Sequence, residues 1–159
     1  MNVDSYQVLL NYSFRLLTRK NYSEAEMRTR LDRKGKKVLL SDLESAIPKV
    51  IARLKEFNYI NDDKILENYF EFRLSSRPQG KYFFMNEMRR RGIPLDKATF
   101  EWEKRGINEV DLAQKLLSVK GKKYSGFDPF TRKKKIATFL AGRGFSPETV
   151  WNVLDKLRN

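Results

Sequence analysis

Positively charged side chains gather in short runs of this chain, and such runs are suited to binding anions. The 159-residue sequence holds 33 Lys and Arg against 20 Asp and Glu, giving a formal net charge of +13. Arginine binds phosphate or carboxylate through paired N–H donors, and nucleic acid is the first candidate partner because its phosphates form a dense row. A basic surface without a ligand is the alternative. The candidate binding residues are Arg28, Arg30, Arg33, Lys34, Lys36, Lys37, Arg89, Arg90, Arg91, Lys120, Lys122, Lys123, Tyr124, Arg132, Lys133, Lys134, Lys135 and Arg143.

Aromatic residues could add base stacking to these charges. Tyr124, Phe127 and Phe130 lie in or beside the Gly-rich basic segment 120–129. They could stack on bases, or they could anchor the segment to the helices around it, and both interpretations stay open. Five other aromatic residues stand within predicted helices, where we expect them to pack in the core. These are Tyr82, Phe83, Phe84, Phe100 and Trp151.

Groups suited to catalysis or metal binding are scarce. The sequence has no Cys and no His, which excludes disulfides, thiol catalysis, Cys/His zinc sites and histidine bases. Asp62, Asp63 and Glu67 could be imagined as the metal site of a nuclease, but Asp62 fits better as a helix N-cap followed by an acidic first turn. No Walker-type loop is present, so we expect no ATP hydrolysis. We therefore predict a protein that is not an enzyme, with no cofactor and no metal.

The ends and the apolar stretches bear on the cellular compartment. The first residues lack both a basic and an apolar region, so we expect no signal peptide. No apolar stretch approaches the length of a membrane span. The absence of Cys fits a reducing cytosol. We expect a cytoplasmic protein with no membrane partner.

The elements that must position these residues are predicted to be helices, because apolar residues recur at helical spacing and no run alternates as a strand would. Ser23 and Glu26 form a capping-box pattern. Gly35 stands where a left-handed C-terminal residue is expected, and the stretch 36–46 should be a loop or a short helix. The predicted helices cover residues 4–19, 23–34, 47–58, 62–75, 81–91, 94–104, 109–119, 130–142 and 147–157.

One helix ending recurs along the chain and indicates a repeat. An apolar residue, two variable residues, a base and a glycine end at Gly35, Gly92 and Gly144. A proline suited to the first turn of a helix follows each glycine, at Pro48, Pro94 and Pro147. Three-helix units of this size bury too little surface alone, so neighbours must stack. The sequence predicts an all-α protein of three tandem three-helix repeats, at residues 1–60, 61–106 and 107–159.

Four segments together resemble the RecX family of modulators of the RecA recombinase. They are residues 15–35; residues 50–63 with 68–73; residues 77–80 with 86–93; and residues 132–150. No one motif is diagnostic, but their order and spacing are specific. The chain departs from the family pattern in the stretch 36–46 and in the run from Phe100 to Glu103.

The resemblance implies a fold and a function. The fold is three three-helix repeats in an elongated, curved array. The function is binding along the groove of the RecA filament on DNA, which inhibits the ATPase, strand-exchange and coprotease activities of RecA. We expect a monomer that binds the RecA filament, and single- or double-stranded DNA are further candidate ligands. The alternative is a sequence-nonspecific DNA-binding protein without a RecA partner.

Overall fold

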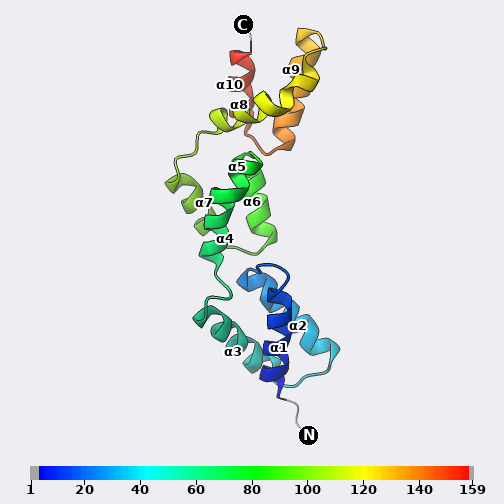
Figure 1. The fold of residues 1–159 in the computed structure, drawn as a ribbon, viewed down its shortest axis with the longest axis vertical. Helices are drawn as coiled ribbons and strands as arrows, with labels where there is room; N and C mark the ends of the chain where they lie inside the picture. The colour runs from blue at the N-terminus through cyan, green and yellow to red at the C-terminus, as the bar shows by residue number, and fades with distance from the viewer. Residues whose placement is uncertain (1–3, 158–159) are drawn as a thin grey trace. The chain divides into compact units, whose positions relative to one another are not determined.

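The structure is a computed structural model that describes residues 4–157, and within them it contains helices and no strand (Figure 1). The prediction of an all-α protein built from three-helix repeats is confirmed. None of the described helices is both long and apolar enough to cross a membrane. The elements are α1 (Ser5–Leu17), α2 (Glu24–Lys37), α3 (Leu43–Glu56), α4 (Asp62–Asn68), the π-helical turn η1 (Tyr69–Arg73), α5 (Leu74–Ser76), α6 (Lys81–Arg90), α7 (Leu95–Lys104), α8 (Glu109–Lys120), the 3₁₀ turn η2 (Gly121–Tyr124), α9 (Pro129–Gly142) and α10 (Pro147–Lys156).

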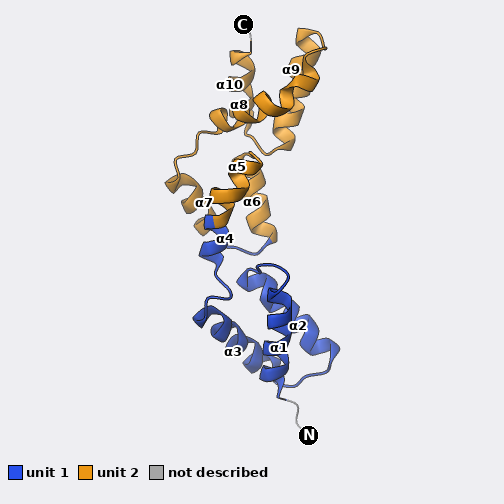
Figure 2. Cartoon of the chain, in the orientation of Figure 1, with its two compact units in different colours: residues 1–67, 91–93 blue, residues 68–90, 94–159 orange. Residues whose placement is uncertain are grey.

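The chain divides into two compact units (Figure 2). Unit 1 comprises residues 1–67 and 91–93, and unit 2 comprises residues 68–90 and 94–159. In unit 1, helices α1, α2 and α3 pack around a core in which Leu9, Met27 and Leu31 are fully buried. Apolar side chains four positions apart on α2 fall on one face, which explains why that face is covered by its neighbours.

Unit 2 has an aromatic cluster and an aliphatic core. The rings of Phe84 and Trp102 lie 5.2 Å apart between centroids, and Tyr69 lies 4.8 Å from Phe84. Burial of Phe84 and Trp102 removes large apolar surfaces from water, which stabilises the packing of η1, α6 and α7. Helices α8, α9 and α10 enclose an aliphatic core of their own, in which Leu140 is fully buried.

The start signals of two helices are confirmed as predicted. The hydroxyl of Ser23 accepts a hydrogen bond from the Glu26 N–H at 3.1 Å, and the Glu26 carboxylate accepts one from the Ser23 N–H at 2.9 Å. The Ser146 hydroxyl accepts from the Thr149 N–H, and Pro147 is the first residue of α10. These signals succeed because each cap involves residues only three positions apart.

The predicted end of α2 at Gly35 is wrong. The helix runs one half-turn further to Lys37, and Leu39 takes the left-handed conformation with a φ of 53°. The N–H of Leu40 then donates to the Gly35 carbonyl at 2.9 Å, as in a Schellman motif. Gly35 serves another physical purpose: a Cβ atom there would overlap the Leu43 side chain, so glycine permits close packing of α2 against α3.

Two further expectations depend on that helix end. The stretch 36–46 is a loop only over residues 38–42, because its ends belong to α2 and α3. Pro48 lies inside α3 and not in its first turn, since α3 already starts at Leu43. The other two glycines behave as predicted: Gly92 has a φ of 70° and Gly144 a φ of 82°.

Three of the aromatic residues predicted in the core are instead exposed. The exposed fractions are 59% for Tyr82, 63% for Phe100 and 67% for Trp151, whereas Phe84 is buried and Phe83 half-buried. Consecutive helical residues are rotated by about 100°, so one helix has both covered and open faces. Tyr82, Phe100 and Trp151 lie on the open faces of α6, α7 and α10.

A basic groove as the candidate functional site

A groove in unit 2 gathers positively charged side chains from separate parts of the chain. It has a volume of about 690 Å³. One side is formed by the end of η1, α5, the turn that follows it and Phe83, and the other by α8 and the end of α9. Its lining contains five cationic residues and no carboxylate. The lining residues are Arg73, Ser75, Ser76, Arg77, Pro78, Gln79, Phe83, Lys115, Leu116, Val119, Lys120, Gly142 and Arg143.

Backbone hydrogen bonds join the two sides of the groove. The N–H of Gly80 donates to the carbonyl of Arg143 at 2.9 Å, and the N–H of Tyr82 donates to the carbonyl of Gly144 at 3.1 Å. A Cβ atom on Gly80 would overlap the Gly144 carbonyl, so glycine is required for this approach. The width of the groove is therefore set by main-chain contacts.

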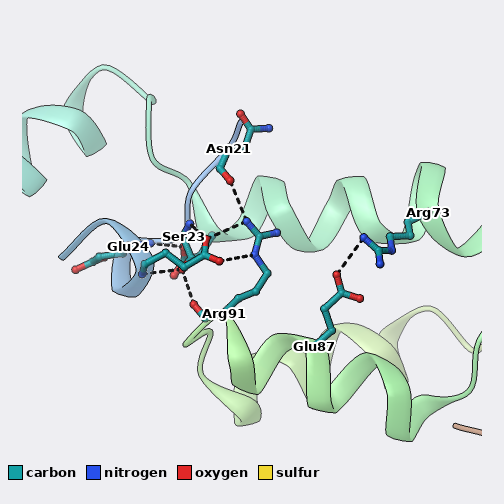
Figure 3. A network of polar contacts seen from close by, with 8 residues as sticks. Asn21, Ser23, Glu24, Arg73, Glu87 and Arg91 are labelled. Carbon is teal, nitrogen blue, oxygen red and sulfur yellow. Dashed lines mark hydrogen bonds and ion pairs between the residues drawn. The ribbon is translucent and has the colours of Figure 1, made fainter. Parts of the chain in front are cut away.

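Three groove cations have no carboxylate partner. Within residues 4–157, Arg77, Lys115 and Lys120 are exposed and form no ion pair. Arg73 differs, because its Nη1 lies 3.2 Å from the Glu87 carboxylate (Figure 3). A groove with uncompensated positive charge and no carboxylate in its lining attracts anions such as phosphates.

A buried polar group supports the floor of the groove. The Tyr69 hydroxyl donates to Gln79 Oε1 at 3.1 Å. Burial raises the pKa of Tyr69 above its usual range, and the nearby Glu87 carboxylate raises it further, so this phenol stays a neutral donor. The other oxygen of Glu87, Oε2, is buried without a hydrogen-bond partner among the described residues.

The basic segment after α8 continues from one end of the groove. The Lys123 ammonium lies 5.0 Å from the ring centroids of both Tyr124 and Phe139, and the Arg143 guanidinium lies 5.3 Å from the Phe139 ring. Phe139 thus contacts one cation from the groove and one from η2. The ring of Tyr124 packs 6.1 Å from Phe139, which favours the anchoring interpretation for Tyr124.

Comparison with known proteins gives the family. The model of the third three-helix domain of RecX matches residues 108–154. The regulatory protein RecX of Prosthecochloris aestuarii is 32% identical over 150 residues, covering 93% of this chain and 92% of the relative. The chain belongs to the RecX family. The regulatory protein RecX of Clostridium perfringens is 28% identical over 159 residues, and the alignment covers 98% of this chain and 71% of the relative.

Solved RecX structures share the fold of this RecX-family chain. The crystal structure of RecX from Lactobacillus salivarius aligns with a TM-score of 0.77 and 19% identity, covering 97% of each chain. A second crystal structure of a regulatory protein RecX aligns with a TM-score of 0.71 and 17% identity, covering 96% of this chain and 74% of the other. The RecX domain model falls on α8, α9 and α10, which include one side of the groove.

The structure places the predicted basic residues of this RecX-family chain in several separate regions. Arg28, Arg30, Arg33, Lys34, Lys36 and Lys37 lie on α2 in unit 1, where Arg28 pairs with Glu24 at 2.9 Å and Lys36 with Asp32 at 2.7 Å. Arg132, Lys133, Lys134 and Lys135 follow the first turn of α9. Lys122 and Lys123 lie in η2, directly after Lys120 at the end of α8. Arg89 and Arg90 lie in a different place, in the last turn of α6. Of all of these, the groove includes only Lys120, together with Arg143.

Arg91 differs from Arg28 and Lys36, which pair within their own helix, because its side chain binds residues of unit 1 that are distant in the sequence. Its Nη2 lies 3.2 Å from the Glu26 carboxylate and donates to the Asn21 carbonyl at 3.0 Å (Figure 3). Burial raises the pKa of Glu26, but hydrogen bonds from Arg91 and from the Ser23 N–H outweigh it and hold that pKa below its usual range. Arg91 is thus held in place by the fold.

The acidic residues considered for a metal site have another arrangement. Asp62 does not cap its own helix as predicted; Asn61 does so, accepting a hydrogen bond from the Lys64 N–H at 3.1 Å. The Asp62 carboxylate instead accepts from the Glu24 N–H at the start of α2, at 3.0 Å. Among residues 4–157, no group of three or more acidic side chains is placed to hold a metal ion.

Three groove residues were missed by reasoning from sequence. Arg73, Arg77 and Lys115 stand outside the basic runs, and nothing in their local sequence marks them. They become neighbours of Lys120 and Arg143 only through the pairing of the two sides of the groove. Arg77, in the turn between α5 and α6, carried the one available signal, since turn residues flank many binding sites.

Proposed function

We propose that this RecX-family chain binds the RecA–DNA filament and inhibits the recombinase, ATPase and coprotease activities of RecA without catalysing a reaction itself. Membership of a family whose relatives are named regulatory proteins supports the proposal. The observation that carries it is the groove of unit 2, in which five cations face an open volume and none of the lining residues is acidic. A nucleoprotein filament offers the phosphates and carboxylates that such a groove binds.

Inhibition by binding requires a difference in affinity between two states of the filament. A ligand shifts an equilibrium only by the ratio of its affinities for the two states. The protein must therefore bind the inactive arrangement of RecA more tightly than the active one. The groove supplies affinity for anions, and the contacts that differ between the two states supply the inhibition.

The test is a titration of the purified protein into the DNA-dependent ATPase assay of RecA. The groove variant combines Arg77→Gln, Lys115→Gln and Lys120→Gln. The matched control removes the same charge at three exposed lysines outside the groove and the basic runs, with Lys49→Gln, Lys104→Gln and Lys156→Gln. Each lost contact weakens binding by about 0.5–1 kcal/mol, so the half-inhibitory concentration should rise roughly tenfold or more in the groove variant.

The possible outcomes separate the function from the site. An absence of any effect of the wild-type protein on RecA ATPase at low salt would refute the proposed function. Equal inhibition by the groove variant and the control would refute the groove as the binding site. A third variant, with charge reversal at Arg132 and Lys134, measures the contribution of α9 in the same assay.

The alternative is sequence-nonspecific DNA binding without RecA, which the absence of carboxylates in the groove lining also favours. DNA affinity would then fall steeply with salt, and the groove variant would lower the slope of log K against log[salt] by about 2–3. Salt-dependent DNA binding combined with no effect on RecA would select this alternative.

A further inference from the structure

The start of α2 is held by residues that come much later in the chain but fold within unit 1. The Ser23 hydroxyl donates to the Arg91 carbonyl (Figure 3). The Glu24 N–H donates to the Asp62 carboxylate at 3.0 Å. Gly92, with a φ of 70°, lies so close to α2 that a Cβ atom would overlap one of its side chains. Three groups therefore contact the start of α2: a carboxylate, the main-chain carbonyl of an arginine, and a glycine.

The start of α6 in unit 2 is held in the same way. The Gly80 N–H donates to the Arg143 carbonyl at 2.9 Å, and the Lys81 N–H donates to the Glu109 carboxylate at 2.6 Å. Gly144, with a φ of 82°, packs so closely that a Cβ atom would overlap the backbone of α6. A carboxylate, an arginine carbonyl and a glycine thus recur at the start of α6, although the donor to the carbonyl is a main-chain N–H at Gly80 and a hydroxyl at Ser23.

This recurring junction has two halves. We call the N-cap and the first residue of the second helix of a repeat the docking turn; these are Ser23-Glu24 at α2 and Gly80-Lys81 at α6. The docking end belongs to the following repeat. It consists of the carboxylate that begins the first helix of that repeat and the Arg-Gly pair that follows its second helix. Docking ends are Asp62 with Arg91-Gly92, and Glu109 with Arg143-Gly144. In a tandem array, one docking turn and one docking end are left over, at opposite termini.

The leftover docking turn is Asp128-Pro129, and it lacks the required donor. Pro129 is the first residue of α9 and has no N–H to offer a carboxylate. The Asp128 carboxylate already accepts from the Thr131 N–H at 2.9 Å. Its negative charge would also repel an incoming docking carboxylate, so this turn is satisfied without another repeat.

The leftover docking end lacks the carboxylate and the glycine, although Val38 still offers a main-chain carbonyl at the position of the arginine. Ser5 stands where the first helix should begin with a carboxylate, and its hydroxyl donates to the Ser41 carbonyl at 2.8 Å. Val38 and Leu39 replace the Arg-Gly pair. Leu39 keeps the left-handed conformation that glycine has elsewhere, with a φ of 53°, and its side chain is 90% exposed.

We propose that Leu39 and Pro129 close the two ends of the repeat array against head-to-tail addition of a second copy of this chain. Each end departs from the repeat pattern at the position where the interior junctions use a glycine or an N–H donor. A head-to-tail contact between identical chains would generate rings or open polymers. The leucine side chain occupies the space that glycine leaves for close approach, and the proline removes the donor. The proposal stands independently of the proposed function.

The test opens one end at a time by copying the unit 2 junction. One variant carries Ser5→Glu, Val38→Arg and Leu39→Gly, and the other carries Asp128→Gly and Pro129→Lys. Neither variant should associate with itself, because each retains one closed end. Mixed together, the two should form a one-to-one complex, measured by light scattering coupled to gel filtration over a wide concentration range.

Two controls test the role of the missing Cβ atom and the folding of each variant. Leu39→Ala in place of Leu39→Gly restores a Cβ atom and should abolish the mixed complex. Circular dichroism of each variant verifies its helix content. If a multiple variant loses helix, the single variants Leu39→Gly and Pro129→Lys are mixed in its place, because they disturb the fold least. The proposal is overturned if the wild-type chain itself forms head-to-tail polymers, or if the well-folded opened variants stay monomeric when mixed.

Discussion

Replacing Gly144 by alanine tests the main-chain pairing that shapes the groove. Gly144 has a φ of 82°, which L-residues with a Cβ atom rarely adopt, and a Cβ atom would overlap the backbone of Phe83. The carbonyls of Arg143 and Gly144 also accept the two hydrogen bonds from Gly80 and Tyr82. The substitution therefore combines a conformational cost with a steric one at a junction of two segments.

The magnitude follows from these two costs. The left-handed conformation costs a residue with a Cβ atom about 1–2 kcal/mol, and overlap in a packed region costs about 1–3 kcal/mol. Gly144→Ala should lower the free energy of unfolding by roughly 3 kcal/mol. Gly142, two residues earlier, is the matched control: it is helical and a Cβ atom there meets nothing within 4 Å. Gly142→Ala should raise stability by about 0.5–1 kcal/mol.

Urea denaturation followed by tryptophan fluorescence measures both variants. The two tryptophans of the chain, Trp102 and Trp151, both belong to unit 2, so the signal reports on the unit that contains the substitutions. The expected midpoints lie on opposite sides of the wild-type value. A Gly144→Ala variant as stable as the wild type, or midpoints that both shift in one direction, would contradict the expected cost of a Cβ atom at Gly144.

Three further predictions concern single residues. Phe84→Ala should cost about 3–5 kcal/mol and Phe100→Ala less than about 0.5 kcal/mol, since one ring is buried and the other 63% exposed; equal losses in urea would contradict the packing described. Leu39→Gly should stabilise unit 1 by about 1 kcal/mol by relieving a left-handed leucine, and a loss of stability measured by circular dichroism would show that the side chain packs. The pKa of Glu26 is lowered in the folded chain, so its stabilisation is complete above the unfolded carboxyl pKa of about 4.3 and is lost as the pH falls through the folded value. Glu26→Gln should flatten this acid-side loss in thermal melts, and an unchanged pH dependence would rule out a role for the Arg91 contact.

Features that depend on neighbours in sequence were predicted correctly. The capping box of Ser23 and the start of α10 at Pro147 involve residues within one turn of each other. The left-handed Gly92 and Gly144 follow from the local preference for glycine at helix ends. Gly35 was misassigned because its reason is tertiary: it lies against Leu43 across the α2–α3 contact.

Features that depend on which face of a helix is covered could not be read from the sequence. Phe100 and Trp102 are two residues apart on α7, and only the packing of α6 and η1 decides that Trp102 is the buried one. The same holds for the candidate site. Basic runs drew attention to α2 and α9, whereas the groove recruits isolated cations such as Arg77 and Lys115 from segments that the sequence separates by almost forty positions.

The start of α2 also limits how pieces of this chain can be exchanged. Its partners Asp62 and Arg91 lie beyond residue 60, the predicted end of the first repeat, although both fold within unit 1. A fragment cut at residue 60 would lose the acceptors of the Ser23 hydroxyl and the Glu24 N–H. An exchange of a whole repeat between relatives must therefore include a matching carboxylate and Arg-Gly pair from the following repeat. The smallest segment that can be exchanged without losing these contacts thus includes parts of two repeats.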